Sequence, residues 1–318
     1  MEKGNKDFSD CLDTIFCIQE EAAENKGEDS YYCGCTKKTA IVSVYDGCGG
    51  LGAKEYESFG GRTGAYMASR ILSGAVHDWH HHESARIWSK SSELLRSLDG
   101  YIKEAYNVCL QYAVDNVFIR GSMVRDFPST LALAYAQQIN EEIVLHVVWV
   151  GDSRIYLLDE KGLAQLTVDD TDSADAMENL LRDEVLTNVV SSDGKYRYHY
   201  KKLTIDHPML IFAATDGCFG YISSPMEFEA ILLKTLINSD MPETFKNNLK
   251  KELSLRAGDD IAFGCMSFLF GNFQNTRKCL AKRWKQLSDF VLPKDKEQDL
   301  AKMNEIWRTY KPNYERCL

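Results

Sequence analysis

The chain has 318 residues, of which 44% are hydrophobic and 26% are charged, and its formal net charge is −10. This composition is that of a globular protein with a sizeable core, and the negative charge argues against a nucleic-acid partner, which would require a basic surface. The longest apolar run, 143–150, is too short to cross a bilayer, so no membrane partner is expected.

Two further features indicate a cytoplasmic protein. The first ten residues lack the apolar segment of a secretory signal. The ten cysteines show no CxxC spacing, which argues against a zinc ribbon or a thioredoxin motif and favours free thiols in a reducing compartment. We therefore expect the protein in the cytoplasm.

The first third of the chain gives one strand and two helices. Residues before about Gly27 are polar and give no clear prediction. The β-branched and apolar residues at 39–45 predict a buried strand that ends at Asp46. A glycine-rich loop follows, and apolar residues at helical spacing then predict amphipathic helices over 62–72 and 91–113.

Short strands separated by turns dominate the rest of the body. Two helices interrupt them, over 226–238 and 243–253. This spacing predicts antiparallel pairing rather than alternating βαβ units, and therefore an α+β fold. The strands are expected at 130–137, 143–150, 154–158, 164–168, 196–205, 209–215 and 260–270.

The C-terminal segment has a charge of its own. Residues 271–318 hold 11 Lys or Arg and 6 Asp or Glu, so the first 270 residues carry a net charge of −15. We divide the chain into a body, 1–270, and a basic extension, 271–318, which we expect to dock on the acidic body or on a partner protein. Helical patterns over 277–287 and 294–310, separated at Pro293, predict that the extension is helical.

Several carboxylates lie where an apolar strand begins or ends. For any one of them, an ordinary turn is the better interpretation, because Asp beside Gly suits turns. As a set they are harder to explain, because neighbouring strand ends would gather the anions in one small volume, which is unfavourable without a cation. Oxygen ligands of this kind suit Mg²⁺ or Mn²⁺. The residues are Glu28, Asp29, Asp46, Asp152, Asp216, Asp259 and Asp260.

These carboxylates belong to short segments that follow one another in a characteristic order along the chain. The segments resemble the motifs of the type 2C, or metal-dependent, serine/threonine protein phosphatases of bacterial type, from about residue 20 to residue 270. The resemblance implies an αββα sandwich, in which helices flank two stacked antiparallel sheets. The segments are GEDSYY (27–32), VYDGCGG (44–50), PSTLAL (128–133), VGDSRIYLL (150–158), QLTVDDT (165–171), LIFAATDGCFGYI (210–222) and GDDIAFGCMSF (258–268).

The resemblance implies a site for two or three Mg²⁺ or Mn²⁺ ions. Asp46 would bridge two of them, and the carbonyl of Gly47 would bind one. Asp216 and Asp259 would bind the other. Asp152 matches the position associated with a third, weaker metal site.

The resemblance also implies the reaction, in which a metal-activated water hydrolyses phosphoserine and phosphothreonine in protein substrates. Glu28 and Asp29 would hold metal-bound waters and would form the catalytic set with Asp46 and Asp216. An arginine that grips the phosphate is usual four residues before Glu28, but this chain has a glutamate there. The nearest cation is Lys26, a candidate for substrate binding. A lysine ammonium group is a point charge and lacks the paired hydrogen bonds that an arginine guanidinium group gives to a phosphate.

Two other functions stay open at this stage. The loss of the arginine would suit a pseudophosphatase that keeps the fold as a binding module, whereas the full set of metal ligands favours an enzyme. Hydrolysis of small phosphoesters is the third alternative. Cys48, two residues after Asp46, could also switch the enzyme off on oxidation, although simple packing is its other interpretation.

The histidines are expected to be structural. His77, His80, His81 and His82 form a run that we predict to be the solvated end of a helix rather than a zinc site. His146 is expected to be a satisfied core residue. No partner for any histidine can be identified from the sequence.

Overall fold

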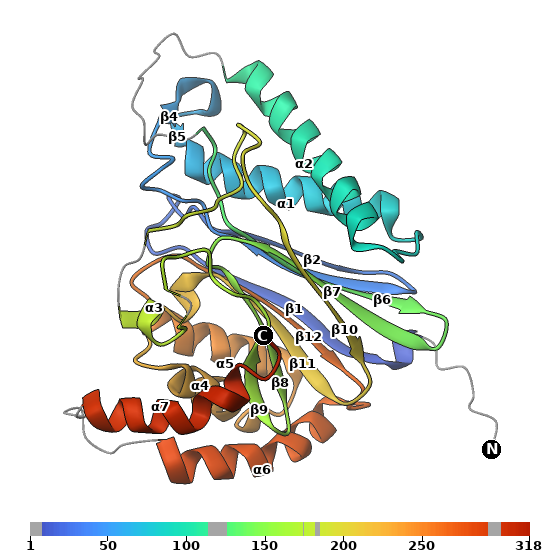
Figure 1. Ribbon diagram of the computed structural model, residues 1–318, viewed down its shortest axis with the longest axis vertical. Coiled ribbons are helices and arrows are strands. Elements are labelled where there is room, and N and C mark those ends of the chain that lie inside the picture. The colour runs from blue at the N-terminus through green and yellow to red at the C-terminus, as the bar shows by residue number, and fades with distance from the viewer. Residues whose placement is uncertain (1–7, 114–125, 174, 182–184, 292–299) are drawn as a thin grey trace.

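The computed structural model describes residues 8–113, 126–173, 175–181, 185–291 and 300–318. Two five-stranded antiparallel sheets stack face to face, and helices cover both outer faces (Figure 1). The predicted αββα sandwich is therefore confirmed. Among the described residues, no helix is both long and apolar enough to span a membrane.

The first sheet has the strand order β1-β12-β11-β8-β9, and its strands pair antiparallel throughout. Its outer face carries helices from the second half of the chain and from the C-terminal extension. In order across the sheet the strands are β1 (Leu12–Glu20), β12 (Ile261–Phe268), β11 (Met209–Ala214), β8 (Arg154–Asp159) and β9 (Gly162–Gln165).

The second sheet has the strand order β10-β7-β6-β3-β2. Its outer face is covered by the two long N-terminal helices, α1 (Gly64–Glu83) and α2 (Ser91–Tyr112), which lie above it in Figure 1. The strands are β10 (His199–Ile205), β7 (Glu142–Val150), β6 (Leu131–Ile139), β3 (Thr39–Tyr45) and β2 (Ser30–Cys35), and a two-stranded ribbon adds β4 (Glu55–Tyr56) and β5 (Arg62–Thr63).

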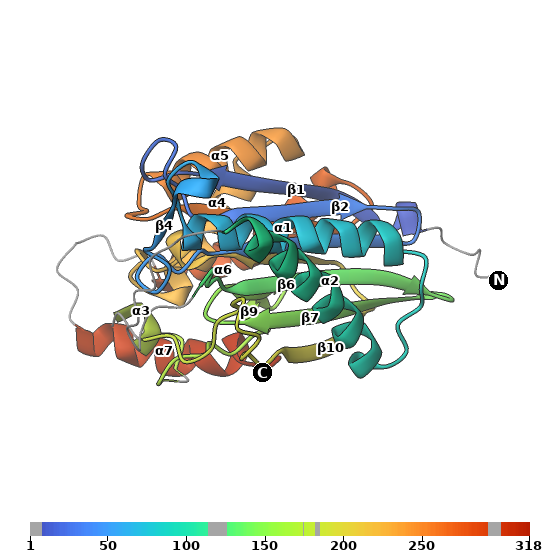
Figure 2. The same cartoon turned by 90° about the horizontal axis from the view of Figure 1, so that it is seen from above.

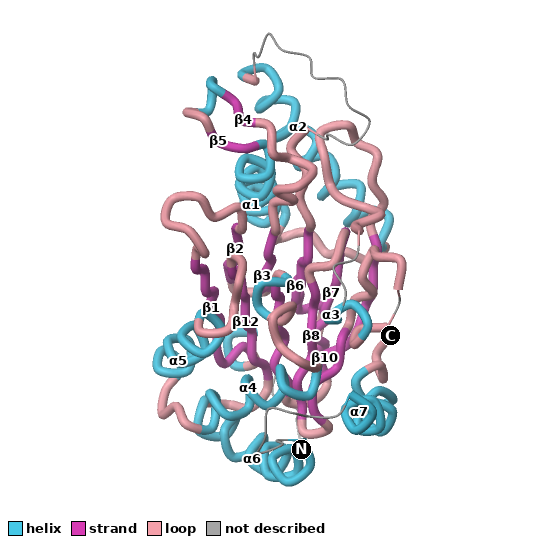
Figure 3. Tube along the Cα trace, turned by 90° about the vertical axis from the view of Figure 1, so that its left-hand side faces the viewer, coloured by secondary structure: helices cyan, strands magenta, loops and turns pink. Residues whose placement is uncertain are grey.

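Three apolar layers hold the sandwich together. The central layer lies between the sheets and contains small and branched residues such as Val42, Ala134 and Ile211. The outer layers lie under the helices, and Figure 3 shows helices, sheets and helices in succession. Figure 2, seen from above, shows α1 and α2 lying across the strands. The remaining helices are α3 (Glu178–Leu181), α4 (Pro225–Ile237), α5 (Pro242–Ser254), α6 (Phe273–Val291) and α7 (Leu300–Tyr314).

The N-terminal segment without a clear pattern contains a strand, β1. It lies at the edge of the first sheet, where half-buried and charged residues conceal the period of two. Its Asp13 carboxylate accepts bonds from the backbone N–H groups of Phe270, at 2.9 Å, and Gly271, at 2.8 Å. The edge strand is thus tied to the turn that leads into the extension.

The first predicted helix has different ends in the structure. It was expected over 62–72, but α1 begins at Gly64, because the side chain of Thr63 caps the N–H of Tyr66 at 3.0 Å. The helix then continues to Glu83 and includes the histidine run.

The helices of the extension lie against the first sheet and α4. Buried apolar side chains of α6 and α7, among them Leu280, join the layer under that sheet. Glu229 of α4 is fully buried, and its carboxylate accepts bonds from Arg283 at 2.6 and 2.8 Å and from the Tyr310 hydroxyl at 2.6 Å. The predicted break at Pro293 lies outside the described residues.

Candidate active site

The strand pairings of the second sheet bring three predicted carboxylates together. Tyr45, the last residue of β3, pairs with Ser30, the first residue of β2. Asp46 therefore lies beside the segment that holds Glu28 and Asp29.

The first sheet brings the others to the same end of the sandwich. Ala214, at the end of β11, pairs with Arg154 at the start of β8 and with Phe263 near the start of β12. The charges of the carboxylates act on one another across the two sheets. We call this group the acidic recess, and its members are Glu28, Asp29, Asp46, Asp152, Asp216, Asp259 and Asp260.

The backbone at Asp46 is fixed by the start of β6. The Asp46 carbonyl accepts bonds from the N–H of Thr130 and the hydroxyl of Ser129, both at 2.8 Å. The Asp46 N–H donates in turn to the Thr130 hydroxyl at 3.1 Å, and that hydroxyl lies 2.6 Å from the hydroxyl of Ser153. These contacts explain the PSTLAL segment, because they orient the Asp46 backbone without engaging its carboxylate.

Glycine follows two of the carboxylates because other backbone comes too close for a side chain. A Cβ atom at Gly47 would clash with the carbonyl oxygen of Ala65, at the start of α1. A Cβ atom at Gly217 would clash with the carbonyl oxygen of Asp260, just before β12. The DG pairs therefore reflect tight packing around the recess as well as turn chemistry.

Two members of the recess are held by hydrogen bonds that the sequence did not predict. Asp29 is buried, and its Oδ2 accepts a bond of 2.7 Å from the hydroxyl of Thr215. The carboxylate of Asp260 accepts bonds from the N–H of Ala22 at 2.7 Å and of Glu28 at 2.6 Å, which ties the loop before β2 to the start of β12. Asp260 is thus a structural member of the recess.

The carboxylates raise one another's pKa. Burial and then the charge of Asp216 raise the pKa of Asp46 and of Asp152 well above the usual range. Burial is the main cause of the raised pKa of Asp29 as well. Burial, followed by the charge of Asp259, raises the pKa of Asp216 to about 6. The recess therefore favours neutralisation, by protons or by a cation.

The donor set fits a hard divalent cation. The side-chain donors are carboxylate oxygens, and Oδ1 of Asp152 is buried without a hydrogen-bond partner among the described residues. In the described part of the chain no three His, Cys, Asp or Glu side chains are already assembled as a metal-binding group.

The exposure of the recess residues falls from the rim inward. Asp259 is exposed, Asp46, Asp152 and Asp216 are half-buried, and Asp29 is buried. The recess is therefore open to solvent at Asp259 and closed at Asp29. The individual metal and water roles given to the recess residues and to the Gly47 carbonyl stay predictions.

A buried ion pair behind the recess explains the GDSR segment. Arg154 and Asp169 are both buried, and Nη2 of Arg154 lies 2.6 Å from Oδ2 of Asp169. Asp169 also accepts bonds from the side-chain amides of Gln165 at 3.1 Å and Asn179 at 2.9 Å. The charge of Arg154 lowers the pKa of Asp152 against the larger effect of burial.

Cys48 is poorly suited to the oxidation switch. The side chain is half-buried, and burial followed by the charge of Asp46 raises the pKa of its thiol well above the usual range. Oxidation requires thiolate character, which this environment suppresses. Packing is the better interpretation of this cysteine, and all ten cysteines are free thiols.

The histidine predictions need two corrections. His80 is buried rather than solvated, and its ring nitrogens lie 3.0 Å from the hydroxyl of Tyr32 and 2.9 Å from that of Thr39. The long helix turns this one histidine of the run toward the sheet. His199 does have a partner, because its Nε2 lies 2.7 Å from the carboxylate of Asp170.

Two more histidines also have partners. His207 lies 3.2 Å from Asp159 and 2.6 Å from Asp206. His146 is buried, and its Nδ1 lies 2.8 Å from the hydroxyl of Tyr200. Its Nε2 has no hydrogen-bond partner among the described residues. His146 is therefore a core residue, as predicted, but only one of its two ring nitrogens is hydrogen-bonded.

Comparison with known proteins identifies the family. The profile of protein phosphatase 2C matches residues 21–254, most of the chain. The chain therefore belongs to the protein phosphatase 2C family, and the prediction of a protein serine/threonine phosphatase that uses Mg²⁺ or Mn²⁺ is confirmed at the level of this family. A search of curated proteins finds no match.

Solved structures share the fold. The serine/threonine phosphatase PstP/Ppp of Mycobacterium tuberculosis is 16% identical, with a TM-score of 0.52 over 81% of this chain and 99% of that chain. A structure of the PstP catalytic domain in complex with 2 manganese ions is 17% identical, with a TM-score of 0.52 and the same coverage. Stp1 of Staphylococcus aureus is 17% identical, with a TM-score of 0.55 over 81% of this chain and 96% of that chain.

Proposed function

We propose that the chain is a metal-dependent protein phosphatase that hydrolyses phosphoserine and phosphothreonine at the acidic recess. The observation that carries the proposal is the gathering of acidic side chains at one end of the sandwich, where burial and neighbouring charges disfavour the charged forms of Asp46, Asp152 and Asp216. Bound divalent cations would offset the repulsion between these carboxylates and so favour their ionised forms. The manganese ions in the similar PstP structure support the choice of ion.

Different residues of the recess would hold different metal ions. Asp46, Asp216, Asp259 and the carbonyl of Gly47 would hold two ions, and Asp152 would hold a third. The bound Mg²⁺ or Mn²⁺ would supply a water that is acidic enough to attack phosphorus at neutral pH.

The carboxylates behind these ligands would orient water. Glu28 accepts a bond from the hydroxyl of Thr63, and Asp29 accepts one from Thr215. Their carboxylates are thus held in fixed directions at the edge of the recess, as suits residues that position metal-bound waters. Lys26, which is exposed on the loop before Glu28, would meet the substrate from the solvent side.

The two parts of the chain would have different tasks. We assign catalysis to residues 1–270 and regulation of access to residues 271–318, either through their contacts with the body or through a partner protein. The contacts of α7 support this division, because Lys311 lies 2.6 Å from Asp175, whose carboxylate caps the segment leading into α3. A signalling role in the cytoplasm is part of this proposal.

A comparison of two substrates tests the proposed function. Phosphate release would be measured from a phosphothreonine peptide and from a small aryl phosphate, after treatment with a chelator and again after addition of Mn²⁺. We expect release only with Mn²⁺, and a larger kcat/KM for the peptide. A larger kcat/KM for the aryl phosphate would favour hydrolysis of small phosphoesters, and release in the chelator would contradict metal dependence.

A binding module is the second candidate function. Glu24, which stands where the family arginine is usual, favours it, because this glutamate would repel a phosphate. A folded chain that binds the phosphothreonine peptide but releases no phosphate with Mn²⁺ would support this candidate and contradict the first.

A further inference from the structure

Two guanidinium groups stack on one aromatic ring at the start of α1. The Cζ atom of Arg62 lies 4.4 Å from the centroid of the Tyr66 ring, and the Cζ atom of Arg70 lies 3.7 Å from it. Arg70 lies one helical turn after Tyr66 in α1, whereas Arg62 reaches the ring from β5, just before the helix begins. Contacts of this kind hold a cation in place without neutralising its charge.

This stack borders the acidic recess. The hydroxyl of Thr63 donates to the carboxylate of Glu28 and accepts a bond of 3.0 Å from the N–H of Tyr66. Arg62 donates from Nη1 to the carbonyl of Asn25, in the loop that leads to Glu28. A chain of direct contacts therefore joins the stack to the recess.

Neither of these arginines forms an ion pair with a described residue, whereas Arg154 and Arg283 are both paired with buried carboxylates. Arg70 uses Nη1 for bonds within its own helix, to the hydroxyl of Ser69 at 3.0 Å and the carbonyl of Tyr66 at 3.3 Å. A guanidinium group has five N–H donors. Most donors of the two stacked arginines are thus available to a ligand.

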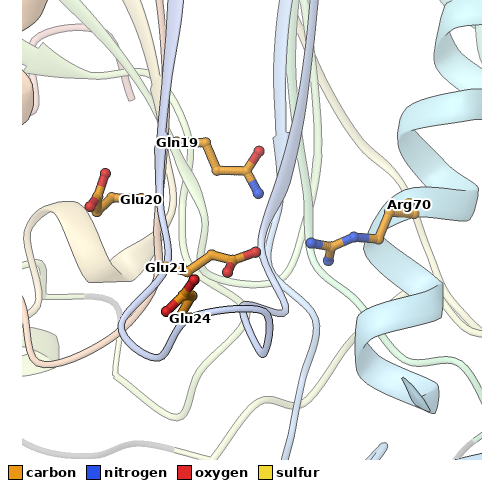
Figure 4. A pocket seen from close by; sticks show the side chains of 5 residues that line it. All are labelled: Gln19, Glu20, Glu21, Glu24 and Arg70. Atoms are coloured by element: carbon orange, nitrogen blue, oxygen red, sulfur yellow. The ribbon is translucent and has the colours of Figure 1, made fainter. Parts of the chain in front are cut away.

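Arg70 also lines an open pocket of about 540 Å³ beside the recess. Figure 4 shows its guanidinium group pointing from α1 toward the strand and loop that carry the other lining residues. Glu20 of the pocket is paired with Lys250 at 2.5 Å, and Glu21 accepts a bond of 2.6 Å from the N–H of Asn25. Arg70 is the one cation among the lining residues, so it is the group there that can attract an anion. The lining residues are Gln19, Glu20, Glu21, Glu24 and Arg70.

We propose that Arg62 and Arg70, positioned by Tyr66, bind the phosphate group of the substrate at the edge of the acidic recess. The inference rests on the proposed function and adds a recognition element to it. A phosphate dianion that approaches carboxylates needs cations on its other side, and guanidinium groups match it with paired hydrogen bonds. Both arginines lie outside the segments that carry the family resemblance, so this chain would bind phosphate from the start of α1 instead of from position 24.

The test compares Arg62→Ala, Arg70→Ala and Arg70→Lys with wild type in Mn²⁺-dependent phosphate release from a phosphothreonine peptide. Arg96→Ala is the matched control, because Arg96 is exposed on α2. We expect each alanine variant at the stack to raise KM and the Ki of inorganic phosphate about tenfold, as loss of a hydrogen bond to a charged group does. Arg70→Lys should recover part of this loss, and thermal melting would verify that the variants fold.

The outcomes separate this inference from the proposed function. Active enzyme with the same KM and Ki in Arg62→Ala, Arg70→Ala and Arg96→Ala would overturn the arginine site and leave the phosphatase intact. If wild type releases no phosphate, the phosphatase fails, and calorimetric titration with the phosphothreonine peptide decides. Weaker binding by the two stack variants alone would then support the arginine site, and equal binding by all variants would overturn it.

Discussion

Asp46→Asn is expected to reduce Mn²⁺-dependent phosphate release by about a thousandfold or more, which corresponds to a loss of about 4 kcal/mol in transition-state stabilisation. The same variant should be more stable than wild type at neutral pH when metal is removed. Burial and the charges of Asp216 and other carboxylates disfavour ionised Asp46, and an uncharged amide of the same shape relieves that repulsion. We expect a gain of about 1 kcal/mol in the free energy of unfolding.

The two halves of this prediction need separate measurements. Phosphate release would be followed with Mn²⁺, and thermal unfolding would be followed by calorimetry in a chelator. Asp240→Asn is the control, because Asp240 is exposed and lies outside the recess, and it should change neither quantity. An Asp46→Asn chain that keeps its activity, or that melts below wild type in the chelator, would contradict the role given to Asp46.

Arg283→Ala is expected to lower the free energy of unfolding by about 3 kcal/mol. The side chain of Glu229 has no solvent exposure, and Arg283 supplies two hydrogen bonds to it. Without the guanidinium group, Glu229 would be a buried carboxylate supported by the Tyr310 hydroxyl alone among the described contacts. Adding Glu229→Gln to the variant should restore part of the loss, because it removes the uncompensated charge.

Urea unfolding would measure these differences. Lys282→Ala is the matched control on the same helix, since Lys282 is exposed, and it should stay within about 0.5 kcal/mol of wild type. Equal stability of Arg283→Ala and Lys282→Ala would show that the extension contributes little to the body. The expected loss would mean that α6 is part of the folded unit rather than an independent appendage.

The sequence was most informative for the strands whose apolar residues form a short run with a turn at each end. The strands β3, β7 and β11 are short apolar runs bounded by turns, and the apolar pattern alone places Asp46, Asp152 and Asp216 at their ends. Antiparallel pairing then brings those ends together. The fold class and the membership of the acidic recess could be predicted for this reason.

Other features depend on contacts between residues that are distant in the chain. Arg70 lies outside every segment that resembles the family, and only its packing on Tyr66 and its effect on Glu28 reveal it beside the recess. The burial of His80 depends on the extension of α1 to Glu83, beyond residue 72, where the local pattern predicted the end of the helix. The edge strand β1 was missed because its residues are half-buried and partly charged.

Metal binding at the acidic recess is the property on which the proposed reaction depends. Calorimetric titration of Mn²⁺ into wild type and Asp216→Asn tests it most directly, because it measures the ions themselves. We expect about two Mn²⁺ ions per wild-type chain and a weakened or lost site in the variant. No binding to the folded wild type, or the same binding by both proteins, would contradict the proposed role of the recess.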